Sequence, residues 1–148
     1  EKERIQTANS VNADLVIALK VDSYKNEKAN GVATYYYGRD DKGVRSVVGE
    51  RFANLLQREI CARTDLLNCR THAKSWELLR LTSAPAVRID LGYLSSPQDA
   101  KRLASAAFRD QLAEAIIVAI QRLYLSAEAD AKTGTLKISD LRRAGLRN

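Results

Sequence analysis

The sequence has 148 residues, of which 45% are hydrophobic and 28% are charged, the profile of a globular domain with a sizeable core. No apolar run approaches the roughly 18 residues of a membrane span, and no segment has the pattern of a signal peptide. Because the sequence contains no methionine, we expect it to be a piece of a longer protein, and any targeting signal would lie upstream.

The net charge of +6 comes mainly from the end of the chain. Residues 1–131 hold 19 basic and 17 acidic side chains, whereas residues 132–148 hold five basic and one acidic. The body therefore lacks the basic excess of a nucleic-acid-binding face. The basic end is typical of a tail that meets an acidic partner, or of a solvated terminus.

The predicted elements alternate between helix and strand in the first half of the chain. Residues 1–10 have the pattern of the last turns of a helix, and the continuous apolar run in residues 13–20 predicts a buried strand. The β-branched and aromatic stretch GVATYYY, residues 31–37, predicts a second strand. Apolar residues at intervals of three and four predict a helix over residues 44–62.

In the middle of the chain, the sequence pattern predicts a loop followed by two strands. The loop runs to Ser75 and holds His72, the one histidine, which we expect to be an exposed loop residue. Residues 76–81 are predicted as a short strand. The stretch PAVRIDL, residues 85–91, is predicted as a third long strand, with its proline first, where the missing N–H costs least.

The last part of the chain predicts two helices and a tail. Ser96 suits the N-cap of a helix and Pro97 its first position, and residues 108–125 have the period of a long helix. After Ser126 the helical repeat of apolar residues ends. We therefore expect a domain over residues 1–126 and a basic regulatory tail over residues 127–148, with a short helix near 138–146.

Strands that alternate with helices predict an α/β fold, a mostly parallel twisted sheet flanked by helices. Ligands bind at the C-terminal ends of the strands in such sheets. Lys20 ends one predicted strand, and Asp90 lies near the end of another, just before Gly92. An ammonium at the end of a buried strand is costly unless it is paired, so these opposite charges mark the expected site.

The two cysteines, Cys61 and Cys69, are eight residues apart. One disulfide between them and two free thiols in a reducing compartment both fit this spacing. A zinc site made of these two cysteines and His72 is a third reading, although the spacing fits no familiar cluster.

Three stretches carry a resemblance to a known family, in the family's order: ANSVNADLVIALKVDS, GVATYYYG and LLRLTSAPAVRIDLGYLSSPQDAKRL. Together they resemble the zinc-dependent N-acetylmuramoyl-L-alanine amidases, which cut the peptide from the glycan in bacterial cell walls. The resemblance covers roughly residues 4–125. It implies the zinc-amidase, phosphorylase/hydrolase-like fold, here without the N-terminal part that carries a zinc-binding His and a zinc-binding Glu.

The departures from the family pattern concern its chemistry. The family's third zinc ligand, a His, falls on Lys20, its catalytic Glu falls on Asp90, and Arg80 matches the family's Arg in the groove. An ammonium has no lone pair for zinc and repels the cation. Asp90 is one methylene shorter than Glu, and proton transfer tolerates little displacement. The resemblance therefore implies a site without an intact catalytic residue, metal or cofactor, unless the chain is an active zinc enzyme with an unusual ligand set.

The charges at this site lead to a geometric prediction. We expect the Lys20 ammonium to stand in for the metal's charge beside the Asp90 carboxylate, directly or through one water. In the alternative, Lys20 is a strand-end lysine that extends into solvent.

Amidase folds without zinc ligands resemble the actinobacterial CwlM-type regulators, which control peptidoglycan precursor synthesis from inside the cell. This resemblance implies a cytoplasmic regulator whose tail is phosphorylated by a Ser/Thr kinase and bound by a phosphothreonine-binding domain. Thr133 and Thr135 are the phosphorylation candidates, although TGT also fits an ordinary linker. The implied enzyme partner is UDP-N-acetylglucosamine 1-carboxyvinyltransferase, with peptidoglycan fragments as further ligands. An exported, active cell-wall amidase and a peptidoglycan-binding module stay open as alternatives.

Overall fold

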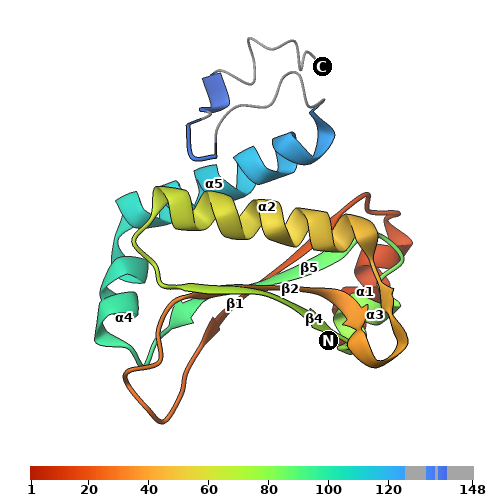
Figure 1. Ribbon diagram of the computed structural model, residues 1–148, viewed down its shortest axis with the longest axis horizontal. Helices are drawn as coiled ribbons and strands as arrows, with labels where there is room; N and C mark the ends of the chain where they lie inside the picture. Colours follow the sequence, from red (N-terminus) through yellow and green to blue (C-terminus); the bar gives the residue numbers. More distant parts are fainter. Residues whose placement is uncertain (126–132, 136, 140–148) are drawn as a thin grey trace.

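The computed structural model describes residues 1–125, 133–135 and 137–139 (Figure 1). Most of the expected tail and of its short helix near 138–146 lies outside these residues. The elements in chain order are α1 (Lys2–Ser10), β1 (Val16–Asp22), β2 (Val32–Arg39), a 3-10 turn (Asp40–Lys42), β3 (Val44–Arg45), α2 (Val47–Arg63), β4 (Asn68–Lys74), α3 (Glu77–Leu81), β5 (Ala86–Tyr93), α4 (Pro97–Ala104) and α5 (Ala106–Tyr124).

The strands form a single mixed sheet. β1 pairs with β5 and β4 with β2 in parallel, whereas β2 is antiparallel to both β5 and β3. The expected α/β sheet flanked by helices is confirmed, and its pairing is evenly mixed rather than mostly parallel. β1 and β5 run side by side in parallel and end at the same edge, as the expected closeness of Lys20 and Asp90 requires.

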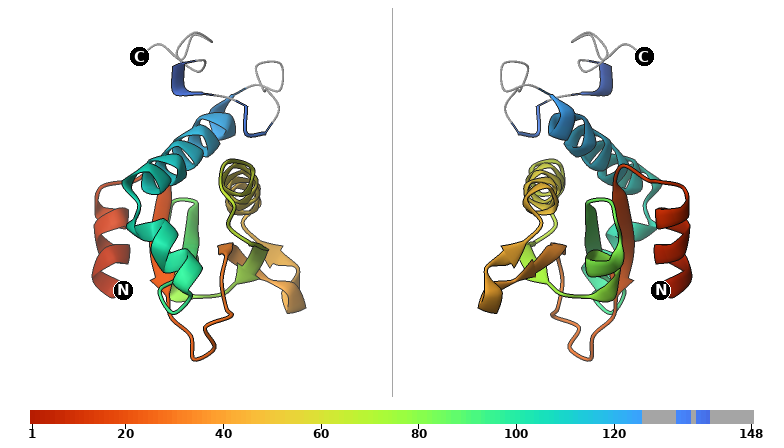
Figure 2. Two further views of the ribbon diagram at one scale, coloured as in Figure 1. Left: turned by 90° about the vertical axis from the view of Figure 1, so that its left-hand side faces the viewer. Right: turned by 90° about the vertical axis from the view of Figure 1, so that its right-hand side faces the viewer.

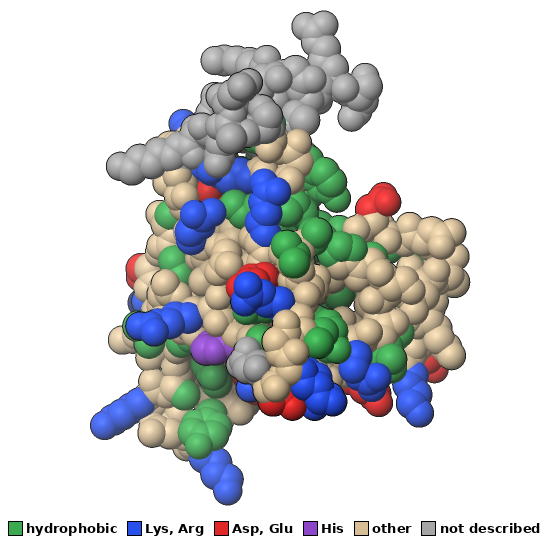
Figure 3. All heavy atoms as spheres, turned by 45° about the vertical axis from the view of Figure 1, so that its right-hand side comes forward, with side chains coloured by type: hydrophobic (Ala, Val, Ile, Leu, Met, Phe, Trp, Pro, Cys, Tyr) green, Lys and Arg blue, Asp and Glu red, His purple; other side chains and the backbone are tan. Residues whose placement is uncertain are grey.

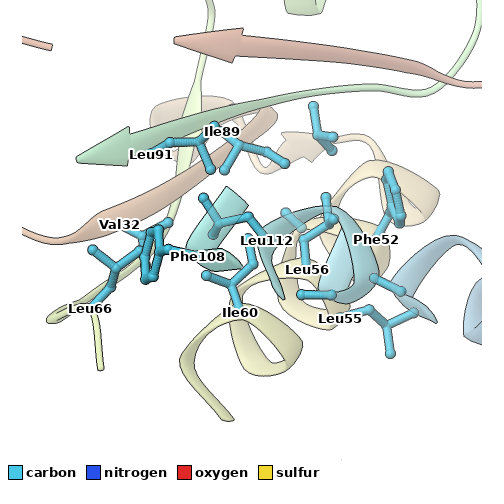
Figure 4. Close-up of a cluster of buried hydrophobic side chains, with 14 residues drawn as sticks. Val32, Phe52, Leu55, Leu56, Ile60, Leu66, Ile89, Leu91, Phe108 and Leu112 are labelled. Atoms are coloured by element: carbon cyan, nitrogen blue, oxygen red, sulfur yellow. The ribbon is translucent and has the colours of Figure 1, made fainter. Parts of the chain in front are cut away.

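The core lies between the sheet and two long helices. α2 and α5 pack together over one face of the sheet (Figures 1 and 2). Figure 4 shows Ile89 and Leu91 of β5 pointing toward Leu56 and Ile60 of α2 and toward Phe108 of α5, and all five are buried. Because strand side chains alternate between faces, Arg88 and Asp90, which flank Ile89, point to the opposite face of the sheet.

Serine caps fix the beginnings of the three longer helices after β3. The side chains of Ser46, Ser96 and Ser105 accept hydrogen bonds from the backbone N–H groups of Gly49, Asp99 and Phe108, respectively. Each cap satisfies an N–H that the first turn of a helix leaves without a partner. The predicted helix start at Ser96 and Pro97 is thus confirmed.

Two predicted elements in the middle of the chain are wrong. The expected loop before Ser75 contains strand β4, on which His72 lies beside Tyr35 of β2. Its polar sequence NCRTHAK belongs to an edge strand that is paired on one side, so it lacks the apolar run of a buried strand. Residues 76–81 form α3 rather than a strand, because the buried neighbours Leu78 and Leu79 share one side of a helix but would lie on opposite faces of a sheet.

Among the described residues, no helix combines the length and apolar character that crossing a bilayer requires.

Candidate functional site

The strand ends predicted as the site do come together, but their charges pair differently. Lys20 of β1 lies opposite Asp90 of β5 in the parallel register. Its Nζ is 3.8 Å from Oδ1 of Asp22, and the two side chains are 45% and 35% exposed. The direct form of the predicted Lys20–Asp90 ion pair is therefore wrong, and a bridge through one water stays a prediction. Lys20 pairs along its own strand and is partly in solvent.

The partner of Asp90 is Arg88, two residues earlier on the same strand and therefore on the same face. Its Nε lies 2.7 Å from Oδ1 and its Nη2 lies 2.9 Å from Oδ2, a bidentate fork on a carboxylate that is only 9% exposed. The hydrogen bond to Asp90 is the largest cause that raises the pKa of Arg88 above its usual value. The guanidinium of Arg88 thus compensates the negative charge of Asp90. The ammonium of Lys20 is not needed for that purpose.

Two neighbouring aromatic rings lie beside the guanidinium of Arg88. Its Cζ is 4.0 Å from the ring centroid of Trp76 and 5.3 Å from that of Tyr35, both within cation–π range. The two rings lie 4.7 Å apart between centroids. Burial, followed by the charge of Asp90, raises the pKa of Tyr35, which favours its neutral phenol. Arg88 is thus fixed by a carboxylate in its plane and by aromatic rings.

Further basic and aromatic groups extend this cluster toward β4. His72 is exposed, its ring centroid is 5.6 Å from that of Tyr35, and its Nε2 is 2.7 Å from the carbonyl oxygen of Cys69. Nζ of Lys74 lies 5.8 Å from the Trp76 ring centroid. In Figure 3 the histidine side chain is visible at the surface among lysine and arginine side chains. We call this set the aromatic–basic face: Tyr35, His72, Lys74, Trp76 and Arg88.

Arg80 lies apart from this cluster. It is exposed in the last turn of α3 and lines a groove of about 310 Å³ together with Tyr37, Val48 and Pro85. That groove is at the beginning of β5, whereas Asp90 lies four residues beyond Ala86, roughly 13 Å along the strand at 3.3 Å per residue. The structure therefore places Arg80 on a groove that does not include Lys20 or Asp90, and its role as the family's Arg stays a prediction.

Cys61 of α2 and Cys69 of β4 are free thiols in the structure. Burial is the largest cause that raises the pKa of both thiols, and for Cys61 the neighbouring Cys69 adds to it. A raised pKa lowers the thiolate fraction and with it the reactivity at neutral pH. A disulfide between them stays a prediction.

The phosphorylation candidates flank a turn that touches the body of the molecule. Thr133 is half-buried, Thr135 is exposed, and the backbone N–H of Gly134 between them donates to the carboxylate of Glu59 at 3.1 Å. Nothing in this arrangement tests their modification, which stays a prediction.

The residues present do not fit zinc. Zinc requires lone-pair donors, and Lys20 presents an ammonium at the position where the family has a histidine. Both oxygens of Asp90 are already bound by Arg88. In the part of the chain that the structure describes, no three His, Cys, Asp or Glu side chains gather in a group that suits a metal.

Arg88 was not among the residues predicted for the site, although the sequence carries a signal for it. Arg88 and Asp90 are two residues apart in a strand whose other members are apolar, and that spacing puts both on one face. Trp76 could not be placed, because its contact with Arg88 depends on α3, which was predicted as a strand.

Comparison with known proteins identifies the family. A family model described as N-acetylmuramoyl-L-alanine amidase matches residues 1–122. The chain is 43% identical over 141 residues to the N-acetylmuramoyl-L-alanine amidase CwlM of Mycobacterium tuberculosis, which covers 95% of this chain and 34% of that protein. It is 26% identical over 126 residues to the germination-specific N-acetylmuramoyl-L-alanine amidase of Bacillus subtilis, which covers 83% of this chain and 50% of that one.

Solved structures agree with the sequence relatives. An N-acetylmuramoyl-L-alanine amidase from Clostridium difficile 630 superposes with a TM-score of 0.75 at 25% identity, covering 85% of this chain and 66% of that one. AmiC2 of Nostoc punctiforme gives 0.73 at 28% identity, covering 84% and 65%. The chain spans about a third of CwlM and half of the germination-specific enzyme. On this sequence match and this fold, the chain belongs to the N-acetylmuramoyl-L-alanine amidase family.

Proposed function

We propose that this chain is part of a non-catalytic, amidase-like regulator of peptidoglycan precursor synthesis that acts through protein–protein contacts. The observation that carries the proposal is the state of Asp90. This carboxylate stands where the resemblance puts the catalytic Glu, and a bidentate guanidinium occupies both its oxygens. A general base needs an oxygen within reach of the proton that it takes, whereas both oxygens of Asp90 accept hydrogen bonds from Arg88.

Lys20 supports the same conclusion, because it removes a donor for zinc. Its ammonium takes the place of a neutral imidazole donor and already pairs with Asp22. Loss of the donor and occupation of the base are separate changes, and each opposes zinc-assisted amide hydrolysis. We propose that the fold is retained as a binding surface and that no cofactor is used.

The tail and the cysteines support a regulatory role inside the cell. Residues 132–148 are strongly basic, and Thr135 in their midst is exposed. We propose Thr133 and Thr135 as targets of a Ser/Thr kinase and as ligands of a phosphothreonine-binding domain. Two free thiols fit the reducing cytoplasm that such a role requires.

The proposed enzyme partner is UDP-N-acetylglucosamine 1-carboxyvinyltransferase, with peptidoglycan fragments as further ligands. The similarity to CwlM is the support for this choice, because the resemblance to that group implies the partner. Protein binding is compatible with the fold. A protein of the same fold at 21% identity, the CwlD amidase of Clostridioides difficile, was solved in complex with the GerS lipoprotein.

A second candidate function is an active, exported zinc amidase of the cell wall. The observation that favours it is that the matched relatives, including CwlM, are named amidases. In that case zinc would need donors other than Lys20.

The proposed function is tested with the full-length protein and the purified carboxyvinyltransferase. The regulator is used in three forms: kinase-treated, untreated, and kinase-treated with Thr133→Ala and Thr135→Ala. We expect the kinase-treated protein alone to raise the turnover of the transferase. Equal turnover with all three forms would refute the phosphorylation-controlled contact.

A further inference from the structure

A buried carboxylate between the two long helices has a third partner from the far end of the chain. Glu59 of α2 stands in the apolar repeat of that helix, and its side chain is 1% exposed. Nε of Arg63 lies 3.0 Å from its Oε2, and Nε of Arg122 from α5 lies 2.8 Å from its Oε1. Arg63 also reaches Glu114 of α5 at 3.9 Å. The charges therefore join α2 to α5.

The third partner is the backbone of Gly134. Its N–H is 3.1 Å from Oε2 and 3.4 Å from Oε1 of Glu59, seventy-five residues earlier in the sequence. A hydrogen bond from an N–H to a carboxylate is charge-assisted and stronger than one between neutral groups. One backbone amide of the C-terminal segment is thus seated on a buried charge of the body.

The shape of the contact admits glycine alone. Gly134 has φ of +81°, in the left-handed region that other residues rarely adopt. A Cβ at this position would lie 2.8 Å from Cβ of Ala62, closer than real Cβ contacts come. The positive φ of residue 134 and its short distance to Ala62 therefore both require glycine. An ordinary linker would tolerate many residues at such a position.

We propose that residues 133–135 form a clip that docks the C-terminal segment onto the α2–α5 pair, with Glu59 as its receptor. Figure 2 shows the described part of this segment above α2 and beside α5, on the side away from the sheet. The docked clip leaves Thr133 half-buried and Thr135 exposed. Glu59 keeps its two arginine partners when the clip opens, and opening exposes Thr133 and frees the segment for a partner.

Hydrogen–deuterium exchange of the full-length protein tests the clip. The variant Gly134→Val adds a side chain where Ala62 leaves no room and φ is positive. Its matched control is Gly43→Val, because Gly43 also has positive φ, +60°, but an added Cβ there meets no atom within 4 Å. Both lie outside the helices and the sheet, so both proteins should keep the wild-type melting temperature to within a few degrees.

The expected result is specific to one variant. Peptides that cover residues 133–139 should exchange at least tenfold faster in Gly134→Val than in the wild type, and at the wild-type rate in Gly43→Val. Unchanged exchange in Gly134→Val, or equal acceleration in both variants, would overturn the proposal. The readout does not involve phosphorylation or the transferase, so it stands or falls independently of the proposed function.

Discussion

At the scale of single residues, two ion pairs on one face of the sheet differ in their physical setting. Arg88 and Asp90 are 22% and 9% exposed and meet in a bidentate fork. Lys20 and Asp22 are 45% and 35% exposed and meet at 3.8 Å. Coulomb attraction gains little in the screened, exposed pair, whereas removing one partner of a buried pair leaves a charge without compensation.

The first prediction is that Arg88→Met destabilises the protein strongly. Asp90 would then stay buried as an unpaired carboxylate, and the cation–π contacts with Trp76 and Tyr35 would be lost. We expect a loss of about 3 kcal/mol in the free energy of unfolding, measured by urea denaturation. The matched control is Lys20→Met, for which we expect less than about 1 kcal/mol. Equal losses in both variants would contradict this prediction, because Lys20 would then matter to stability as much as Arg88.

The second prediction concerns the ionisation of Asp65 as the pH falls. The hydrogen bond from Arg102 is the largest cause that lowers the pKa of Asp65 below its ordinary value of 3.8. A carboxyl with a lowered folded pKa stabilises the protein above its unfolded pKa, and this contribution is lost as the pH falls through the folded value. NMR titration should find Asp65 still ionised below pH 3.8 in the wild type. In Arg102→Gln, its pKa should return toward the ordinary value, and an unmoved pKa would contradict this account.

At the scale of elements, a buried aspartate joins two strands to a helix. Asp99 is 0% exposed, near the beginning of α4. Its Oδ2 accepts the N–H of Gly31 at 2.9 Å and of Tyr93 at 3.1 Å, and its Oδ1 lies 3.1 Å from Nη1 of Arg102. Gly92, with φ of +118°, is needed here because a Cβ would lie 2.9 Å from Oδ2 of Asp99. One carboxylate thus ties the start of β2 and the end of β5 to α4.

The third prediction is that Asp99→Ala weakens this junction. Two backbone donors and Arg102 would lose their acceptor in a buried place, so we expect a loss of about 3 kcal/mol in the free energy of unfolding. Asp110→Ala, on the exposed side of α5, is the control and should change it by less than about 0.5 kcal/mol. Calorimetry of the wild type, Asp99→Ala and Asp110→Ala measures both changes in the free energy of unfolding. A small loss at Asp99 would mean that water replaces its carboxylate.

How far the elements could be predicted depends on how each is buried. β2, β5, α2 and α5 carry apolar patterns because they form the core, and the sequence predicted all four. The strand β1 was also predicted, but as a buried strand, whereas it lies at the edge of the sheet and none of its residues is buried. β4 and α3 were wrong, because a polar edge strand and a five-residue helix bury too little to leave a pattern. At the site, the strand ends were placed correctly, but the partner of Asp90 was not. Rotamers and competition between two cations decide that pairing, and neither is visible in residue order.

At the scale of the whole molecule, the charge of the tail contrasts with the near-neutral body. Residues 132–148 carry five basic residues and one acidic residue, and residues 133–135 contact α2 through Glu59 and Ala62. The part of the body that the structure describes brings together a five-stranded sheet, the aromatic–basic face and the α2–α5 helix pair. A modification in the tail would therefore act on a segment that both touches the body and carries most of the net charge.

The fourth prediction concerns modification of this tail. Each phosphate adds about −1.5 to −2 charge, so two would roughly neutralise residues 132–148. Thr135 is exposed and Thr133 half-buried, so we expect Thr135 to be modified first. Mass spectrometry of the protein from its native cells during growth should find phosphate at Thr135, alone or with Thr133. A tail that carries none, or Thr133 alone, would contradict the proposal.

The proposed function requires that Lys20, Asp90 and Arg88 do not form a zinc-dependent hydrolytic site. Elemental analysis of the purified full-length protein, paired with release of peptide from muropeptide substrate, tests it most directly. The account predicts far less than one zinc per molecule and no release, with or without added zinc. One zinc per molecule, removed by a chelator together with amidase activity and restored with it, would contradict the account.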